Sequence, residues 1–163
     1  MRRTILAVAL VSIPLSLGAA DPQADFRYNG NGYVFFSAGS CQHRYFNVGV
    51  GGGGEAFLWR GLALGVDAGY YRFPADRNVG YGVLTLNPGY HFVNRKKPMK
   101  FDPYVSGTVL GIAFAPGAIA PAGGLGFGVN YWFKERMGLQ TGVQAQGVDG
   151  EALIVFRIGL TFR

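Results

Sequence analysis

The sequence predicts an all-β fold, an eight-stranded antiparallel up-and-down transmembrane β-barrel preceded by a cleavable signal peptide. Three observations predict it. Apolar residues alternate with glycine or polar residues in repeated segments of about ten residues, the length of a strand that crosses a membrane. The 163-residue chain contains 27 glycines and 15% aromatic residues, and only 15% of its residues are charged. Its N-terminal segment is basic and then apolar, as in exported proteins.

The first twenty residues have the parts of a secretory signal. Two arginines precede an apolar stretch, and small residues follow at 18–20. The apolar stretch is too short for a transmembrane helix, which needs about 20 residues, and Pro14 interrupts it. We therefore expect a signal peptide over residues 1–20 and one outer-membrane β-barrel domain over residues 21–163.

Eight segments show period-two alternation and are separated by short connections. We expect strands at 30–39, 45–57, 62–73, 79–91, 103–113, 122–133, 137–147 and 151–163. Eight is an even number, as bacterial single-chain barrels require. With a periplasmic N-terminus, the outward connections are 40–44, 74–78, 115–121 and 148–150. All four are short, which limits the surface available for docking a receptor.

The alternation assigns side chains to two faces, because successive residues of a strand point to opposite sides. In 62–73, Asp67 opposes a row of apolar residues, and in 122–133 glycines oppose apolar and aromatic residues. In 151–163 one face is wholly apolar, and Arg157 lies on the other. The four glycines at 51–54 resemble a phosphate loop only superficially. No Lys-Ser/Thr pair follows them, and glycine within a strand permits bending.

The same parity predicts a polar lumen. An eight-stranded barrel is about narrow enough for side chains to fill it, and buried charges are costly unless paired. We expect Arg157 to form an ion pair with Glu55 or Asp67 that plugs or gates the lumen. The alternative is that trapped water solvates these groups. The expected lumen residues are Asn47, Glu55, Asp67, Thr85, Asn87, His91, Ser106, Thr108, Gln140, Gln144, Gln146 and Arg157.

Aromatic residues gather on the apolar face, several of them near strand ends, as the interfacial belts of a membrane barrel require. Pro88 also falls on that face. Since proline removes a donor from the ladder, we expect a bulge or bend there. The expected lipid-facing aromatic residues are Phe46, Tyr70, Tyr90, Phe92, Tyr131, Phe133, Phe156 and Phe162.

Other classes of site find little support in the sequence. The net charge of +6 comes largely from the leader and from one basic turn at 95–100. That turn has no aromatic platform or basic helix, so no nucleic-acid partner is expected. Cys41 is the only cysteine, which excludes an intrachain disulfide and any multi-cysteine metal site. No cofactor and no metal site follow from the sequence.

The leader, the segment FDPYV at 101–105 and the run GGLGFGVNYWFKER at 123–136 resemble the small OmpA/OmpX-like outer-membrane β-barrel family. The resemblance covers essentially all of the mature chain. It implies a Gram-negative-type outer membrane, contact with outer-membrane lipid, insertion by the barrel-assembly machinery, and a structural or surface-interaction role with at most a narrow lumen. Family members commonly end in an aromatic assembly signal. Here Phe162 provides it, offset by Arg163.

Two other functions remain as alternatives. A barrel-embedded lipid A-modifying enzyme needs a nucleophile beside a histidine base. The two histidines, His43 and His91, do not show that family's histidine-serine spacing, so we expect no enzyme. A secreted, soluble, lipocalin-like barrel would bind a small apolar ligand. It would need a charge-rich exterior, and neither strand face of this chain provides one.

Overall fold

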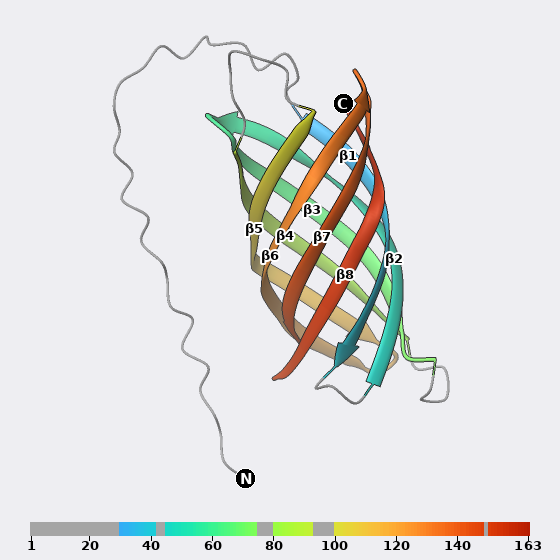
Figure 1. Ribbon diagram of the computed structural model, residues 1–163. Helices are drawn as coiled ribbons and strands as arrows, with labels where there is room; N and C mark the ends of the chain where they lie inside the picture. The colour runs from blue at the N-terminus through green and yellow to red at the C-terminus, as the bar shows by residue number, and fades with distance from the viewer. Residues whose placement is uncertain (1–29, 42–44, 75–79, 93–99, 149) are drawn as a thin grey trace.

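A computed structural model describes residues 30–41, 45–74, 80–92, 100–148 and 150–163. Each strand pairs antiparallel with the next, and the first pairs with the last, so the sheet closes into a barrel (Figure 1). This confirms the predicted fold class. The expected signal peptide lies outside the described residues. The strands are β1 (Gly30–Cys41), β2 (Tyr45–Trp59), β3 (Leu62–Arg72), β4 (Gly80–His91), β5 (Phe101–Ala115), β6 (Ala118–Lys134), β7 (Met137–Val148) and β8 (Glu151–Phe162).

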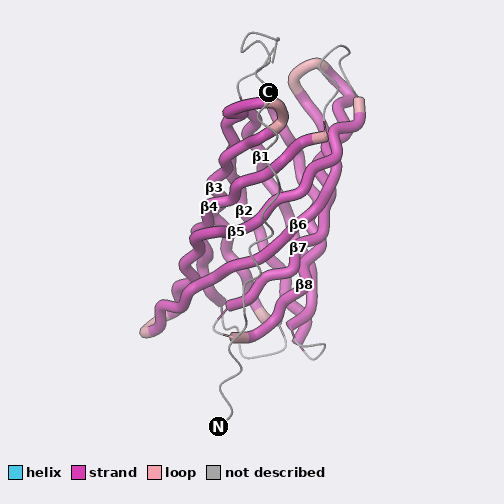
Figure 2. The backbone as a smooth tube through the Cα atoms, turned by 90° about the vertical axis from the view of Figure 1, so that its left-hand side faces the viewer, coloured by secondary structure: helices cyan, strands magenta, loops and turns pink. Residues whose placement is uncertain are grey.

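The two ends of the barrel differ in what they hold. We call the end with Gly30, the C-terminus and the turns β2–β3 and β6–β7 the terminal end, and the opposite end the loop end (Figure 2). At the terminal end, Arg60 and Gly61 make the β2–β3 turn with φ values of 42° and 85°. At the loop end, Gly150 has a φ of 81° before β8. Positive φ favours glycine, which explains two of these three positions.

The main departure from the predicted strands is the hairpin of β5 and β6. The prediction of a connection over 115–121 was wrong, because β5 continues to Ala115 and β6 starts at Ala118. Only Pro116 and Gly117 form the turn. Proline followed by a glycine with a φ of 80° is what a tight type II turn requires, and no polar residue interrupts the flanking strands.

A bulge interrupts β5 opposite Pro88. The β4–β5 register shifts between Leu86 and Gly89, as the proline predicted, and the surplus residue lies on β5. Val109 and Leu110 are consecutive there, yet both point outward, with exposures of 68% and 62%. Proline has no backbone N–H to donate, and the bulge interrupts the hydrogen-bonded pairing of β4 and β5 at that point.

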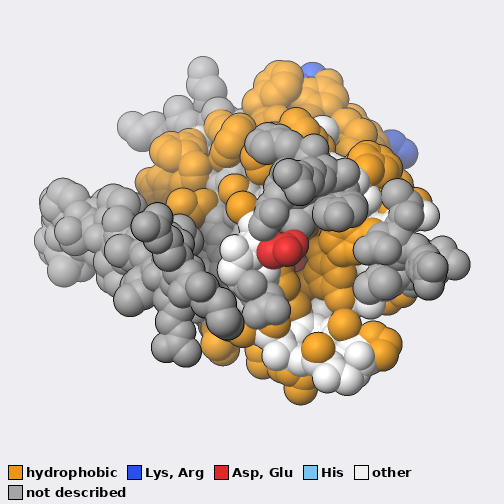
Figure 3. Space-filling view, turned by 90° about the horizontal axis from the view of Figure 1, so that it is seen from below, with side chains coloured by type: hydrophobic (Ala, Val, Ile, Leu, Met, Phe, Trp, Pro, Cys, Tyr) orange, Lys and Arg blue, Asp and Glu red, His pale blue; other side chains and the backbone are white. Residues whose placement is uncertain are grey.

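Outside the barrel, apolar side chains dominate. The large hydrophobic residues that point outward have exposures from 37% to 81%. Hydrophobic side chains cover much of the described surface seen from the loop end (Figure 3). Polar side chains point inward instead. Asn47, Asn130 and Thr161, for example, are fully buried. The barrel is therefore apolar outside and largely polar inside.

Candidate functional site in the barrel lumen

The structure places the polar residues selected from the sequence inside the barrel. The strand alternation puts them on the lumen face, where most have less than a tenth of their surface exposed. Asn47, Asp67, Thr85, Asn87, His91, Gln140, Gln144 and Gln146 are buried, while Glu55, Ser106, Thr108 and Arg157 are partly buried. The eight aromatic residues selected for the outer face are all exposed: Phe46, Tyr70, Tyr90, Phe92, Tyr131, Phe133, Phe156 and Phe162.

Arg157 lies at the centre of one charged group, the Arg157 cluster, which comprises Tyr33, Phe35, Asp67, Tyr71 and Arg157. Its Nη1 donates to Oδ2 of Asp67 at 2.9 Å, and its Nη2 donates to the Tyr71 hydroxyl at 2.9 Å. The Tyr33 hydroxyl donates to the other oxygen of Asp67. The guanidinium also lies over the Phe35 ring, 4.2 Å from its centroid. Of the two carboxylates proposed from the sequence, Arg157 therefore pairs with Asp67.

Glycines of β2 make room for this cluster. A Cβ at Gly51 would lie 2.5 Å from the Phe35 ring, and one at Gly53 would lie 2.5 Å from Oδ1 of Asp67. Such contacts are far closer than van der Waals distance. The glycines at 51–54, which we call the glycine floor, thus leave space in which side chains of β1 and β3 meet. This role adds to the bending expected from the sequence.

A second charged group, the His91 cluster, lies nearer the terminal end and comprises Glu55, His91, Asp102, Asn130 and Arg163. Nδ1 of His91 lies 2.8 Å from Oδ1 of Asp102, and Nε2 lies 3.1 Å from Oε2 of Glu55. Asn130 donates to Asp102 at 3.4 Å, and the Arg163 guanidinium lies 3.8 Å from the same oxygen, Oδ2.

The contacts of this second cluster restrict the combinations of charge that it can hold. An ionised carboxylate only accepts hydrogen bonds, so two ionised carboxylates require both ring nitrogens of His91 to donate. The imidazole is then positively charged. With Arg163, it balances the charges of Glu55 and Asp102, just as Arg157 balances Asp67. His91, Arg157 and Arg163 therefore each lie within reach of a lumen carboxylate.

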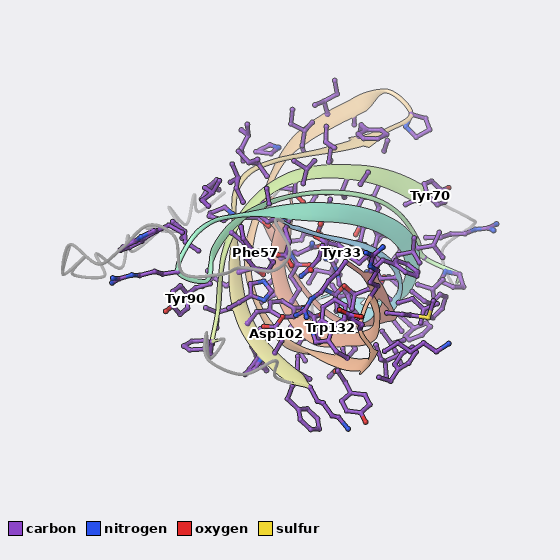
Figure 4. The ribbon with its side chains drawn as sticks, turned by 90° about the horizontal axis from the view of Figure 1, so that it is seen from above. Tyr33, Phe57, Tyr70, Tyr90, Asp102 and Trp132 are labelled. Carbon is purple, nitrogen blue, oxygen red and sulfur yellow. The ribbon has the colours of Figure 1, made fainter. Side chains whose placement is uncertain are left out.

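Sequence reasoning missed Asp102, because the expected strand started one residue after it. Its parity could have revealed it, since Asp102 lies on the same face as Tyr104 and Ser106. Figure 4 looks down the barrel from the terminal end. It shows Asp102 and Tyr33 inside the ring of strands, and Tyr70 and Tyr90 outside it.

Between the two clusters lies a polar cavity of about 40 Å³. One water molecule needs roughly 10–15 Å³ of such space, so the cavity is large enough for ordered water. Nε of Arg157 and Oε1 of Gln144 have no protein hydrogen-bond partner in the described structure, and both residues line this cavity. Water would satisfy both atoms. Its lining residues are Tyr33, Glu55, Gly65, Asp67, Asn87, Gly89, His91, Tyr104, Ser106, Gln140, Gln144 and Arg157.

Beside the cavity, neutral polar side chains of β4, β5 and β7 form a series of hydrogen bonds inside the lumen. Thr108 donates to Oδ1 of Asn87 at 2.7 Å, and Asn87 donates to Thr85 at 2.9 Å. Gln144 reaches Thr108 at 3.5 Å. Gln140, also selected from the sequence, lines the cavity.

Towards the loop end, the lumen contains a cluster of buried apolar side chains, which sequence reasoning did not anticipate. We call this group the apolar plug. Tyr71, Val83, Ala113, Leu153 and Val155 are buried together, and Phe73 and Tyr81 pack against them. A signal was present, because both faces of β8 are apolar at 153–156. The apolar plug lies on the loop-end side of Arg157.

Solved structures with the same architecture include three bacterial proteins. Neisserial surface protein A superposes with a TM-score of 0.63 at 13% identity, covering 82% of this chain and 94% of that chain. The N-terminal β-barrel domain of Pseudomonas aeruginosa OprF gives 0.60 at 20% identity, covering 82% and 98%. Ail, the attachment invasion locus protein of Yersinia pestis, gives 0.56 at 8% identity, covering 83% and 99%. This chain has the fold of the small outer-membrane barrels.

The likeness to these outer-membrane barrels is one of fold. No family model matches the chain, and no curated protein matches its sequence. A de novo designed transmembrane β-barrel also superposes, with a TM-score of 0.51 at 19% identity, covering 83% of this chain and 96% of that chain. The arrangement of eight strands is therefore shared with natural and designed barrels of little sequence similarity.

Two further kinds of feature are absent from the described residues. No group of three or more His, Cys, Asp and Glu side chains there is arranged to hold a metal ion. The same part of the chain has no helix that is long and apolar enough to cross a membrane. His43 lies outside the described residues, and the structure describes only the backbone of Cys41, at the end of β1.

Proposed function

We propose that this chain is an integral β-barrel of the outer membrane, with a structural or surface-interaction role and a lumen closed by side chains. The observation that carries the proposal is the distribution of side chains, which is the reverse of that in a water-soluble barrel. The closed barrel presents large apolar residues around its exterior and pairs its charges inside. A closed barrel also satisfies its backbone groups within the sheet, which a bilayer demands.

The strand lengths fit this proposal. The strands contain from 11 to 17 residues. A strand of about 12 residues, rising about 3.3 Å per residue at a tilt of about 40°, covers about 30 Å along the membrane normal. That height matches the hydrocarbon thickness of a bilayer. The residues at 1–20 would act as the export signal, and Phe162 would guide the assembly machinery.

Two layers of side chains support a closed lumen. The Arg157 cluster crosses the middle of the barrel, and the apolar plug fills the space on its loop-end side. Water in the polar cavity would meet the apolar plug before reaching the loop end. We infer that the barrel conducts ions poorly or not at all.

The alternatives find less support. A soluble lipocalin-like barrel would carry polar side chains outside, whereas Phe156, Phe127 and Ile119 have exposures of 62%, 62% and 81%. A lipid-modifying enzyme would need a histidine nitrogen free to activate a hydroxyl. Both ring nitrogens of His91 lie against carboxylate oxygens instead. We therefore propose a non-catalytic role.

The experiment that tests this proposal is gel mobility. The mature protein is refolded in detergent micelles and run in SDS with and without boiling. A closed membrane barrel resists SDS until it is heated, so the unboiled sample should migrate faster. A sample that shows no shift and remains soluble in buffer without detergent would overturn the proposal.

A further inference from the structure

The hairpin of β5 and β6 has a composition unlike that of a water-exposed loop. Between Thr108 and Asn130, every residue is apolar or glycine. This stretch includes the turn at Pro116 and Gly117 and both strand segments beside it. The turns β2–β3 and β6–β7, by contrast, contain Arg60 and the pair at 135–136, which are charged. We call residues 112–121 the hairpin tip.

The hairpin tip extends beyond its neighbours. The first pair between β6 and β7 joins Ala122 to Val148, so the segment 118–121 has no partner on that side among the described strands. On its other side, this segment pairs with β5. Figures 2 and 4 both show this hairpin reaching sideways beyond the ring of the barrel. The tip therefore combines an apolar surface with a free strand edge.

The outward side chains of the tip continue the apolar exterior of the barrel. Phe114 pairs with Ile119 across the hairpin, and their exposures are 52% and 81%. Ile119 is the most exposed large hydrophobic residue in the described structure. The Phe114 ring lies over Gly82, where an added Cβ would come within 2.2 Å of the ring. Further along the same face of β6, Phe127 is 62% exposed.

Neither bulk water nor the hydrocarbon centre suits such a tip. In water, its apolar side chains would remain exposed at a cost proportional to their area. In hydrocarbon, the unpaired backbone groups of 118–121 would lack hydrogen-bond partners, and Pro121 removes only one donor. The boundary between headgroups and acyl chains offers apolar contact on one side and hydrogen-bonding groups on the other.

We propose that the hairpin tip is an interfacial membrane anchor that lies beside the barrel, at the headgroup–acyl boundary on the loop-end side. Ile112, Phe114 and Ile119 contact acyl chains, and the free edge at 118–121 is solvated by headgroups and water. This inference rests on the proposed function, because it requires the barrel to be in a membrane. In this arrangement the hairpin contacts lipid, so it is not part of the surface available for binding a receptor.

The test uses nitroxide labels on single cysteines in a Cys41→Ser background, with the barrel reconstituted in phosphatidylcholine vesicles. Ile119→Cys reports on the tip. Phe127→Cys, on the same strand and face, is the hydrocarbon control, and Glu151→Cys, at the loop end of β8, is the water control. The measurement is the ratio of collisions with oxygen to collisions with a water-soluble nickel complex. Retention of the heat-dependent gel shift verifies that each variant folds.

We expect the ratio at Ile119 to be several-fold above that at Glu151 and clearly below that at Phe127. A ratio at Ile119 equal to that at Glu151, together with a high ratio at Phe127, would overturn the proposal of an anchor. The proposal of a membrane barrel would still stand. If Phe127 also reads as water-exposed, the proposed function itself fails.

An Ile119 ratio equal to that at Phe127 would place the tip in hydrocarbon. Dipolar broadening that disappears on dilution with unlabelled protein would mean that a second copy covers the tip. Either of these last two results contradicts the anchor.

Discussion

Arg157 on β8 and Asp67 on β3 meet across the lumen, 90 residues apart in the chain, with Nη1 and Oδ2 separated by 2.9 Å. Both side chains are largely buried, with side-chain exposures of 13% and 8%. The pair links two strands that are not neighbours in the closed sheet, since β1 and β2 separate β8 from β3. It therefore constrains the cross-section of the barrel as well as its charge.

Removal of Arg157 should destabilise the barrel. In Arg157→Ala, Asp67 stays buried without its cation, and losing one partner of a buried pair costs about 3–5 kcal/mol. The measurement is urea unfolding in lipid vesicles. The double variant Asp67→Asn with Arg157→Ala should recover part of the loss, because no lone charge remains. Equal stability of wild type and Arg157→Ala would refute a structural role for the pair.

Conductance should require the loss of both lumen layers. In planar bilayers, Arg157→Ala should stay nearly closed because the apolar plug remains, and Leu153→Ala with Val155→Ala should stay nearly closed because the Arg157 cluster remains. The combined variant removes both layers, so we expect discrete channel openings. Open channels in Arg157→Ala alone would show that the apolar plug does not seal the lumen.

The glycine floor should tolerate a methyl group only on its outward side. A Cβ at Gly53 would lie 2.4 Å from the Val66 carbonyl oxygen, whereas the nearest atom to a Cβ at Gly54 is 3.3 Å away. Gly53→Ala should therefore cost about 1–3 kcal/mol through overpacking, and Gly54→Ala should cost less. Unfolding midpoints in urea compare the two variants. The reverse order would contradict the lumen packing described for β2.

A charge on the outer face should cost more than the same charge in the lumen. Ile158 is 52% exposed on the outer face, and Gln144 lines the cavity that Glu55 and Asp67 share. Ile158→Lys should lose about 2–4 kcal/mol near the bilayer midplane. Gln144→Lys should lose less, because carboxylates are near. Equal losses of unfolding free energy in vesicles would contradict the assignment of Ile158 to the outer face and Gln144 to the lumen.

His91 should be needed to hold two carboxylates together. In His91→Ala, Glu55 and Asp102 lose the ring that separates and neutralises them, and we expect a loss of about 3–5 kcal/mol. Adding Glu55→Gln should restore part of the stability, because Asp102 keeps Asn130 and Arg163 nearby. The readout is the temperature at which the gel shift disappears. If Glu55→Gln worsens the defect, the charge argument is wrong.

The faces of the strands could be predicted from sequence because alternation is a local property. Asp67 and Arg157 were assigned to the lumen from their neighbours alone, and the structure places both there. Their pairing with each other was beyond local reasoning. It depends on the register and stagger of strands that are far apart in the chain, which decide whether Asp67 or Glu55 lies level with Arg157.

The ends of the strands were harder to predict. The stretch 115–121 was predicted as a connection, but two residues suffice for the turn, and the apolar flanks continue the ladder. Asp102 was missed for a related reason, since the strand was predicted to begin one residue after it and the structure starts β5 at Phe101. The apolar plug was overlooked because a polar lumen was assumed along the whole barrel.

The surplus residue in β5 has a consequence for insertions and deletions. By placing Val109 and Leu110 on the same side, the strand absorbs an odd residue locally and keeps Ile112 and Phe114 outward. Another single-residue insertion between the bulge and the turn would need a bulge of its own. Without one, it would rotate those two side chains into the lumen and turn small residues outward. Residues added at the turn of Pro116 and Gly117 carry no such parity requirement, so length variation can accumulate there without inverting either strand.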